Sequence, residues 1–241
     1  MIRTLLAALL LILSVAFVLP WLVLWSLIVG SPDLMYGLAM KVTRFVTRLV
    51  GIRVRIEGLE NIPPGPCVFV SNHVSNVDPT VLIPAIPRRV GILVKQELFR
   101  IPIFSTAMRL AQFIPVDRRD KESTGASVPL AVGNLKKGLS YVIFSEGTRS
   151  PDGRLRSFKR GAFTMAIDAG VPVVPVSIVG TQRLLGKSES TIRPGEATIR
   201  FGPAVDGSAY TMETRSELLA RVESLVAAGL PPDQQPIRSG T

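Results

Sequence analysis

Histidine and cysteine are almost absent from this chain of 241 residues, which holds one His and one Cys. A single cysteine cannot form an internal disulfide, and one His with one Cys argues against a zinc site of the usual nitrogen and sulfur ligands. Aromatic residues make up only 6% of the chain, so there are few platforms on which nucleic-acid bases can stack. We therefore expect no such metal site and no nucleic-acid partner.

Acidic residues are also in the minority, with 18 Asp and Glu against 28 Lys and Arg, which gives a formal net charge of +10. At 47% hydrophobic residues, the chain is too apolar for a disordered protein, and its length allows one ordinary domain with an appendage. A basic and hydrophobic composition points to an anionic partner, and first of all to a membrane surface.

The N-terminus has no charged residue between Thr4 and Pro32. About 20 apolar residues are enough to span the hydrocarbon of a bilayer as a helix. Pro20 interrupts the run, so a short helical hairpin that enters one leaflet is an alternative to a spanning helix. A cleaved signal peptide is the third interpretation, but the run exceeds the usual 7–15 apolar residues of such signals and lacks a clear small-x-small cleavage site.

The charges that flank this segment predict its orientation. Only Arg3 precedes it, whereas Lys41, Arg44 and Arg48 follow it closely. Because basic residues favour the cytoplasmic side, we expect the rest of the chain to face the cytoplasm, at the inner membrane of the cell. The lone Cys67 is compatible with that reducing compartment.

Residues 35–50 are expected to form a basic amphipathic helix, in which Leu38, Val42, Phe45 and Leu49 make an apolar stripe. Two interpretations remain open. The helix lies along anionic headgroups, as basic amphipathic helices do beside a membrane segment, or it packs on the core and exposes its basic face to solvent.

Beyond residue 50, short strand-like runs alternate with helical ones. Strands are predicted at 52–56, 67–71, 90–94, 113–116, 141–144, 173–179 and 197–201. Helices are predicted at 79–86, 98–111, 127–137, 162–169 and 214–228. This alternation indicates an α/β fold with a mostly parallel sheet flanked by helices. We expect a membrane segment with the basic helix at 1–50, the α/β domain at 51–229 and a disordered tail at 230–241.

The only histidine, His73, directly follows a predicted buried strand, and Asp78 precedes a proline where a helix should begin. The two side chains can therefore meet at the carboxyl edge of the sheet, where open α/β sheets bind ligands. A histidine held by a carboxylate is a general base for an alcohol or for water. The alternative is that Asp78 only caps the helix and His73 is a structural loop residue.

Two further strand ends carry arginine. The strand 141–144 runs into Ser145-Glu146-Gly147-Thr148-Arg149-Ser150, and the strand 113–116 runs into Asp117-Arg118. Backbone N–H groups and guanidinium groups at such ends can hold an anion. One base and two arginines at neighbouring strand ends suit a phosphorylated alcohol. The alternative for each arginine is a solvated basic rim that faces lipid headgroups.

These motifs resemble the glycerolipid acyltransferase family, and within it the bacterial 1-acyl-sn-glycerol-3-phosphate (lysophosphatidic acid) acyltransferases. The resemblance covers roughly residues 50–205. It rests on four blocks in the family's order: 72–78 (Asn-His-x4-Asp), 113–118 (FIPVDR), 144–150 (FSEGTRS) and 171–176 (VPVVPV). One departure is Ala111-Gln112, where family members commonly carry Gly, and it puts the local turn in doubt.

The resemblance implies that His73 deprotonates the sn-2 hydroxyl of lysophosphatidic acid and that Asp78 orients this base. The alkoxide then attacks the thioester of acyl-CoA or acyl-carrier protein, which gives phosphatidic acid. Arg118 and Arg149 are expected to hold the acceptor phosphate, and Glu146 and Gly147 to shape the pocket. Thr148 and Lys95 complete the expected substrate-binding residues. No metal or organic cofactor is implied.

Three other functions remain open from the sequence. The acceptor can be another hydroxylated lipid, such as a lyso-phospholipid or an acylated amino acid, because the same base serves any alcohol. Water can replace the alcohol, which makes the protein a thioesterase, although water needs no phosphate clamp. A membrane-binding protein without catalytic activity is the third.

Overall fold

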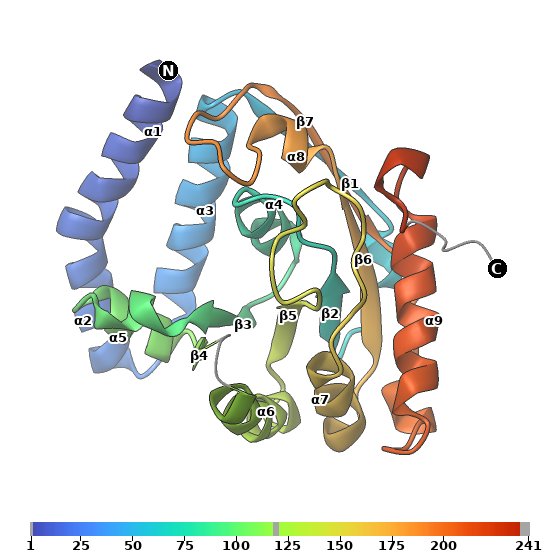
Figure 1. Cartoon of the computed structure of the whole chain (residues 1–241). Coiled ribbons are helices and arrows are strands. Elements are labelled where there is room, and N and C mark those ends of the chain that lie inside the picture. Colours follow the sequence, from blue (N-terminus) through green and yellow to red (C-terminus); the bar gives the residue numbers. More distant parts are fainter. Residues whose placement is uncertain (1, 118–120, 237–241) are drawn as a thin grey trace.

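The computed structural model describes residues 2–117 and 121–236 as a three-layer α/β structure with a helical N-terminal segment at one side (Figure 1). The strands of its sheet are β1 (Ile52–Glu57), β2 (Val68–Ser71), β3 (Val90–Lys95), β4 (Ile114–Val116), β5 (Ser140–Phe144), β6 (Val173–Val179) and β7 (Gly195–Phe201). Its helices are α1 (Ile2–Leu13), α2 (Leu19–Val29), α3 (Asp33–Leu49), α4 (Asp78–Ala85), α5 (Phe104–Leu110), α6 (Lys121–Lys136), α7 (Gly161–Ala169), α8 (Thr181–Leu184) and α9 (Arg215–Ala228).

The sheet runs in the order β1-β7-β6-β2-β5-β3-β4. All neighbouring strands are parallel except β6 and β7, so β1 and β7 run opposite to the other five. The predicted α/β class with a mostly parallel sheet is confirmed. Because β6, β2 and β5 are parallel neighbours, the loops that follow them meet at one edge of the sheet.

Helices cover both faces of the sheet and divide the core in two. On one face, α3 and α4 pack over buried residues such as Phe69, Val176 and Ile199. On the other face, α6, α7 and α9 pack over residues such as Val70 and Tyr141. Phe69 and Val70, which are adjacent in β2, lie on different faces because successive side chains of a strand point to opposite faces.

The N-terminal segment is helical from Ile2 to Val29 and is not split at Pro20. A π-helical turn at Ser14–Val18 lies just before this proline, and the N–H of Leu19 donates to the carbonyl of Ser14. Such a wider turn accommodates the missing N–H and the ring of a proline. Residues Thr4–Val29 are long and apolar enough to cross a membrane, with a mean hydropathy of 2.7.

Helix α3 follows as expected, and part of its apolar stripe is exposed. Met35, Tyr36 and Val46 are buried, whereas Phe45 and Leu49 of the apolar stripe are 59% and 37% exposed. The helix packs against both α2 and α4, and these contacts determine which face is buried.

Two loops differ from the sequence-based expectation. The predicted helix 98–111 is broken into a 3₁₀ turn and α5, because Pro102 lacks an N–H and Ile103 has a φ of 48°. Gln112 has a φ of 60°, in the left-handed region that suits glycine. At this turn, a non-glycine residue therefore adopts a conformation that glycine adopts more easily.

The C-terminal residues also differ from the expectation. The disordered tail was predicted to begin at residue 230, but a 3₁₀ turn at Pro232–Gln234 packs on the domain. The N–H of Leu155 donates to the carbonyl of Gln234 at 2.8 Å, and Gln234 is buried. Residues 237–241 lie outside the described part of the chain.

Candidate active site

Three adjacent loops form the candidate site at the carboxyl edge of the sheet. The loop after β2 carries His73, the loop after β5 carries Glu146, and α8 begins with Thr181, two residues after the end of β6. All three residues are buried, at 7%, 4% and 0% exposure. Since β6, β2 and β5 are neighbours in that order, the histidine lies between the other two.

His73 and Asp78 make direct contact, as the sequence predicted. The Nδ1 atom of His73 lies 2.8 Å from Oδ2 of Asp78. A carboxylate in this position accepts the proton of Nδ1, which leaves Nε2 as the atom that can accept a proton from a ligand. The His73 ring also packs against the Phe144 ring, with a distance of 4.4 Å between the centroids. The imidazole is thus fixed by a hydrogen bond and by ring packing.

The expectation that Asp78 caps the following helix is wrong. Its Oδ2 instead accepts hydrogen bonds from the N–H groups of Val74 and Ser75, which precede it, and no side-chain bond caps α4. The carboxylate therefore organises the turn that carries His73.

The other oxygen of Asp78 has a partner that the sequence analysis missed. The hydroxyl of Thr181 donates to Oδ1 at 2.5 Å. Thr181 lies in the four-residue helix α8, which has too few residues to show a helical periodicity. The only signal was its position, since this polar residue lies two positions after the end of a long buried strand.

The turn between β2 and α4 is also tied to the loop after β5. The backbone N–H of His73 donates to Oε1 of Glu146 at 2.8 Å, and the N–H of Ser150 donates to the carbonyl of His73 at 2.8 Å. On the other side, the amide of Asn72 forms two hydrogen bonds with the backbone of Ile178 in β6. The histidine therefore sits on a backbone that is fixed from both neighbouring strands.

Glu146 is a buried carboxyl group close to the Asp78 carboxylate. Burial, and to a lesser degree the charge of Asp78, raise its pKa from the ordinary 4.5 to about 7. Its Oε2 atom is buried and makes no hydrogen bond within the described residues. Glu146 thus supports the backbone of His73 while its own charge is poorly solvated.

We expect Glu146→Gln to remove a pH dependence of stability. The folded protein keeps the Glu146 proton up to about pH 7, whereas the unfolded chain releases it near pH 4.5. The wild-type free energy of unfolding should therefore fall, relative to the variant, as the pH rises between these values, by at most about 1.4 kcal/mol per pH unit. Glutamine still accepts the hydrogen bond of His73. Denaturant unfolding of both proteins from about pH 5 to pH 8 measures the difference. A constant difference over this range contradicts the assignment.

The predicted anion-binding residues lie on the same loop. Gly147 has a φ of 73°, which favours glycine, and Thr148 is exposed. Arg149 is partly exposed, and its Nη1 donates to the carbonyl of Lys187 at 2.9 Å, while Nζ of Lys187 donates to the carbonyl of Arg149. This exchange of hydrogen bonds fixes the Arg149 backbone and leaves most of its guanidinium donors available.

Two predicted site residues, Lys95 and Arg118, remain besides the dyad of His73 and Asp78. Lys95 ends β3, is 60% exposed and forms an ion pair with Glu97 at 2.9 Å. Arg118 lies outside the described residues. Cys67 is fully buried, and burial raises the pKa of its thiol to about 11, so it is protonated at neutral pH. The described residues at this edge therefore provide a base, its orienting carboxylate and an arginine, but no activated thiol.

Comparisons with known proteins show which family the chain is similar to. The sequence profile of the acyltransferase family matches residues 53–179, which includes the dyad and Arg149. A 1-acyl-sn-glycerol-3-phosphate acyltransferase of Pseudomonas aeruginosa is 34% identical over 79% of this chain and 76% of its own length. A chloroplastic enzyme of that name from Arabidopsis thaliana is 39% identical over 65% of this chain, which spans only 44% of that relative.

A solved structure is similar over almost the whole chain. The 1-acyl-sn-glycerophosphate acyltransferase of Thermotoga maritima has a TM-score of 0.79 and 28% sequence identity, and the match covers 95% of this chain and 94% of that one. The sheet, the loop geometry around His73 and the family profile lead to one conclusion. The chain belongs to the acyltransferase family.

Proposed function

We propose that the protein transfers a fatty acyl group from acyl-CoA or acyl-carrier protein to the sn-2 hydroxyl of 1-acyl-sn-glycerol 3-phosphate and so forms phosphatidic acid. The observation that carries this proposal is the buried His73 whose Nδ1 is held by Asp78 at 2.8 Å. This arrangement provides a base for an alcohol, and the related enzymes named above act on such an acceptor.

The proposed reaction needs only one proton carrier. The Nε2 atom of His73 takes the proton of the acceptor hydroxyl, and the oxygen attacks the carbonyl carbon of the thioester. The bond between carbon and sulfur then breaks, and the protonated imidazole returns its proton to the leaving thiolate. Asp78 stabilises the imidazolium throughout, because its carboxylate stays hydrogen-bonded to Nδ1.

Release of free thiol tests the function. We expect rapid thiol release from acyl-CoA or acyl-carrier protein only when 1-acyl-sn-glycerol 3-phosphate is present, together with an equal amount of phosphatidic acid. Lyso-phospholipids without the phosphate monoester and acylated amino acids serve as competing acceptors. Equal thiol release without any acceptor would instead identify a thioesterase.

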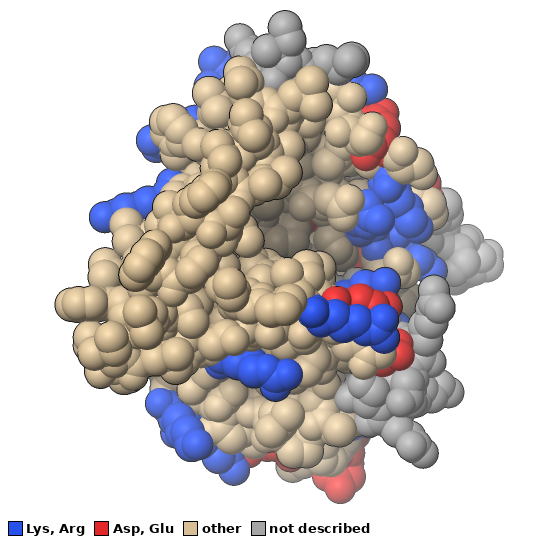
Figure 2. Space-filling model, turned by 90° about the vertical axis from the view of Figure 1, so that its left-hand side faces the viewer, with Lys and Arg blue, Asp and Glu red and all other residues tan. Residues whose placement is uncertain are grey.

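We also infer that the protein sits at the inner membrane with its α/β domain in the cytoplasm. Figure 2 shows the side on which α1 and α2 lie as a broad apolar face, with Lys and Arg along its edges and a hollow opening beside it. The most exposed large apolar side chains there include Leu5, Ile12, Phe17, Trp21 and Ile28. An apolar face with a basic margin suits insertion into an anionic leaflet.

Protease protection tests this orientation. In right-side-out vesicles from cells that make the protein, we expect added protease to leave the chain beyond residue 50 intact. The reason is the basic flank after the apolar segment, which favours the cytoplasmic side. Vesicles opened with detergent are the control and should allow digestion. Digestion in sealed vesicles would reverse the orientation.

Thr181→Val should lower kcat about tenfold and change KM little. Valine has the shape of threonine but no hydroxyl, so Oδ1 of Asp78 loses its donor in a fully buried place, and such a loss costs roughly 1–3 kcal/mol. Thr181→Ser, which keeps the hydroxyl, is the matched control and should retain most activity. Equal losses in both variants would indicate a packing role rather than positioning of Asp78.

A further inference from the structure

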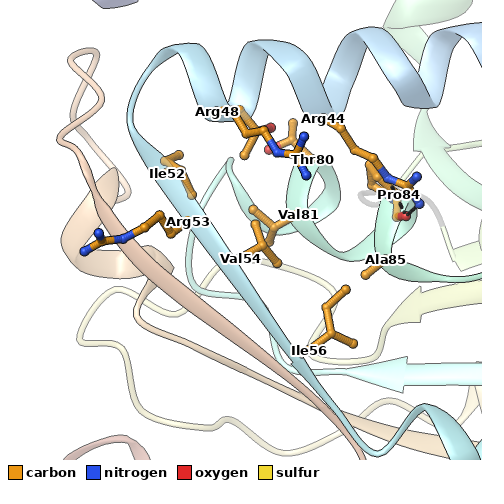
Figure 3. A pocket seen from close by; sticks show the side chains of 11 residues that line it. Arg44, Arg48, Ile52, Arg53, Val54, Ile56, Thr80, Val81, Pro84 and Ala85 are labelled. Atoms are coloured by element: carbon orange, nitrogen blue, oxygen red, sulfur yellow. Dashed lines mark hydrogen bonds between the residues drawn. The ribbon is translucent and has the colours of Figure 1, made fainter.

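A groove with a volume of about 530 Å³ lies between α3, β1 and α4 (Figure 3). None of the residues of the dyad or of the loop after β5 lines it. Figure 3 shows Arg44 and Arg48 extending from α3 towards α4, above the apolar side chains of Val54, Ile56 and Val81. We call this hollow the α3–β1–α4 groove.

The lining of the groove is basic and contains no Asp or Glu. Arg44 donates to the backbone carbonyl of Pro84 in α4. The guanidinium groups of Arg48 and Arg53 make no hydrogen bond or ion pair with any residue that the structure describes. A second hollow of about 510 Å³ is lined by the same Arg48 and Arg53, so both side chains border open space. Unpaired guanidinium groups without a nearby carboxylate favour an anion, and phosphate matches their geometry best.

The floor of the groove is apolar although it lies on an edge strand. Val54 and Ile56 of β1 are 36% and 39% exposed. An ordinary solvent-facing strand carries polar residues at such positions. The volume is in the range of small-molecule sites, and the lining therefore suits a ligand with both an anionic group and an apolar part.

The position of the groove indicates where such a ligand comes from. Helix α3 packs against α1 and α2, the apolar segment proposed to lie in the membrane. On α3 itself, the exposed Phe45 and Leu49 directly follow Arg44 and Arg48. A helix that exposes apolar and basic residues side by side suits the boundary between headgroups and acyl chains. The groove is therefore expected to open at the level of the lipid phosphates.

We propose that the α3–β1–α4 groove binds the phosphate headgroup of an anionic glycerophospholipid from the surrounding leaflet, at a site separate from the catalytic dyad. Arg48 binds the phosphate, Arg44 and Arg53 add positive charge, and the first carbons of the lipid lie on Val54 and Ile56. The groove holds the lipid without chemical change. The inference concerns binding and does not depend on acyl transfer.

Cysteine protection tests the site in the full-length chain with His73→Ala, held in a neutral detergent. The natural Cys67 is fully buried, so an added Ile56→Cys gives selective labelling by a water-soluble maleimide. We expect short-chain phosphatidic acid to slow this labelling at least fivefold, and short-chain phosphatidylcholine to leave it unchanged. Leu59→Cys, exposed but outside the groove lining, is the control and should label at the same rate with either lipid.

Arginine variants identify the phosphate contact. Arg48→Gln should raise the lipid concentration for half protection about tenfold, and Arg48→Gln with Arg53→Gln should raise it further. Arg55→Gln is the matched control, because Arg55 lies on the same strand but pairs with Glu57 at 2.9 Å outside the groove. Unchanged protection in both groove variants overturns the proposal.

Two further experiments ask whether the groove binds a lipid or free phosphate, and whether it is distinct from the catalytic site. Inorganic phosphate should give no protection at the concentration where the lipid protects. If inorganic phosphate protects the Ile56→Cys thiol as well as the lipid does, the groove is not a lipid site. If only acyl-carrier protein protects it, the groove binds an acidic protein and the proposal is overturned. With His73 intact, Arg48→Gln should keep full acyl transfer in neutral detergent. If Arg48→Gln loses acyl transfer in neutral detergent, the groove is part of the acceptor site, and the proposal of a separate lipid site is overturned.

Discussion

His73→Ala is expected to lower acyl transfer by about 10²–10⁴-fold, the usual contribution of a positioned general base. No other histidine can take over, because this is the only one of the chain. The measurement is phosphatidic acid formation with saturating donor and acceptor. The fold should survive, since the imidazole makes one side-chain hydrogen bond and the turn is held by the backbone bonds to Glu146 and Ser150.

Asp78→Asn provides the graded comparison for this result. The imidazole remains in place, so transfer should fall less than in His73→Ala. Circular dichroism and recovery from the membrane fraction show whether both variants are folded. More than about a hundredth of wild-type activity in folded His73→Ala would remove His73 from the mechanism.

Arg149→Ala should weaken use of the acceptor about 10- to 150-fold, the loss expected for one charge-assisted contact with a phosphate. Apart from the bond to the carbonyl of Lys187, its guanidinium has no partner among the described residues, so its donors are available. We expect KM for 1-acyl-sn-glycerol 3-phosphate to rise and KM for the acyl thioester to change little. Initial rates with each substrate varied in turn measure this.

Two variants control this experiment. Arg154→Ala removes the same charge from the same region. Because the Arg154 guanidinium donates to the carbonyl of Gln235, this variant should leave both KM values unchanged. Arg149→Lys should recover only part of the activity, because an ammonium cannot make the bidentate contact. If Arg149→Ala raises only the KM of the donor, the arginine belongs to the CoA or carrier-protein site.

The sequence predicted the sheet well because its strands are short apolar or alternating runs with clear ends. All seven predicted strands overlap observed ones to within two residues. The helix at 98–111 was predicted wrongly, because its apolar pattern continues across Pro102 while the backbone does not. The sequence left open which face of α3 is buried, since periodicity cannot tell which neighbours a helix will have.

The candidate site shows more clearly which contacts can be predicted from the sequence and which cannot. The contact between His73 and Asp78 was predictable, because the two residues flank one turn. The role of the Asp78 carboxylate in that turn was not, since a proline after an aspartate also fits a helix cap. The Thr181 contact joins residues 103 positions apart, and only the arrangement of β6 beside β2 brings them together.

That long separation has a consequence for how the protein is made. His73 and Asp78 leave the ribosome early, together with the apolar N-terminal helix, but the residues that fix them follow much later, at Glu146, Ser150 and Thr181. Contacts so distant along the chain form late in folding. The side chains of His73 and Asp78 can therefore reach their final orientation only after β6 and α8 have been synthesised and have docked.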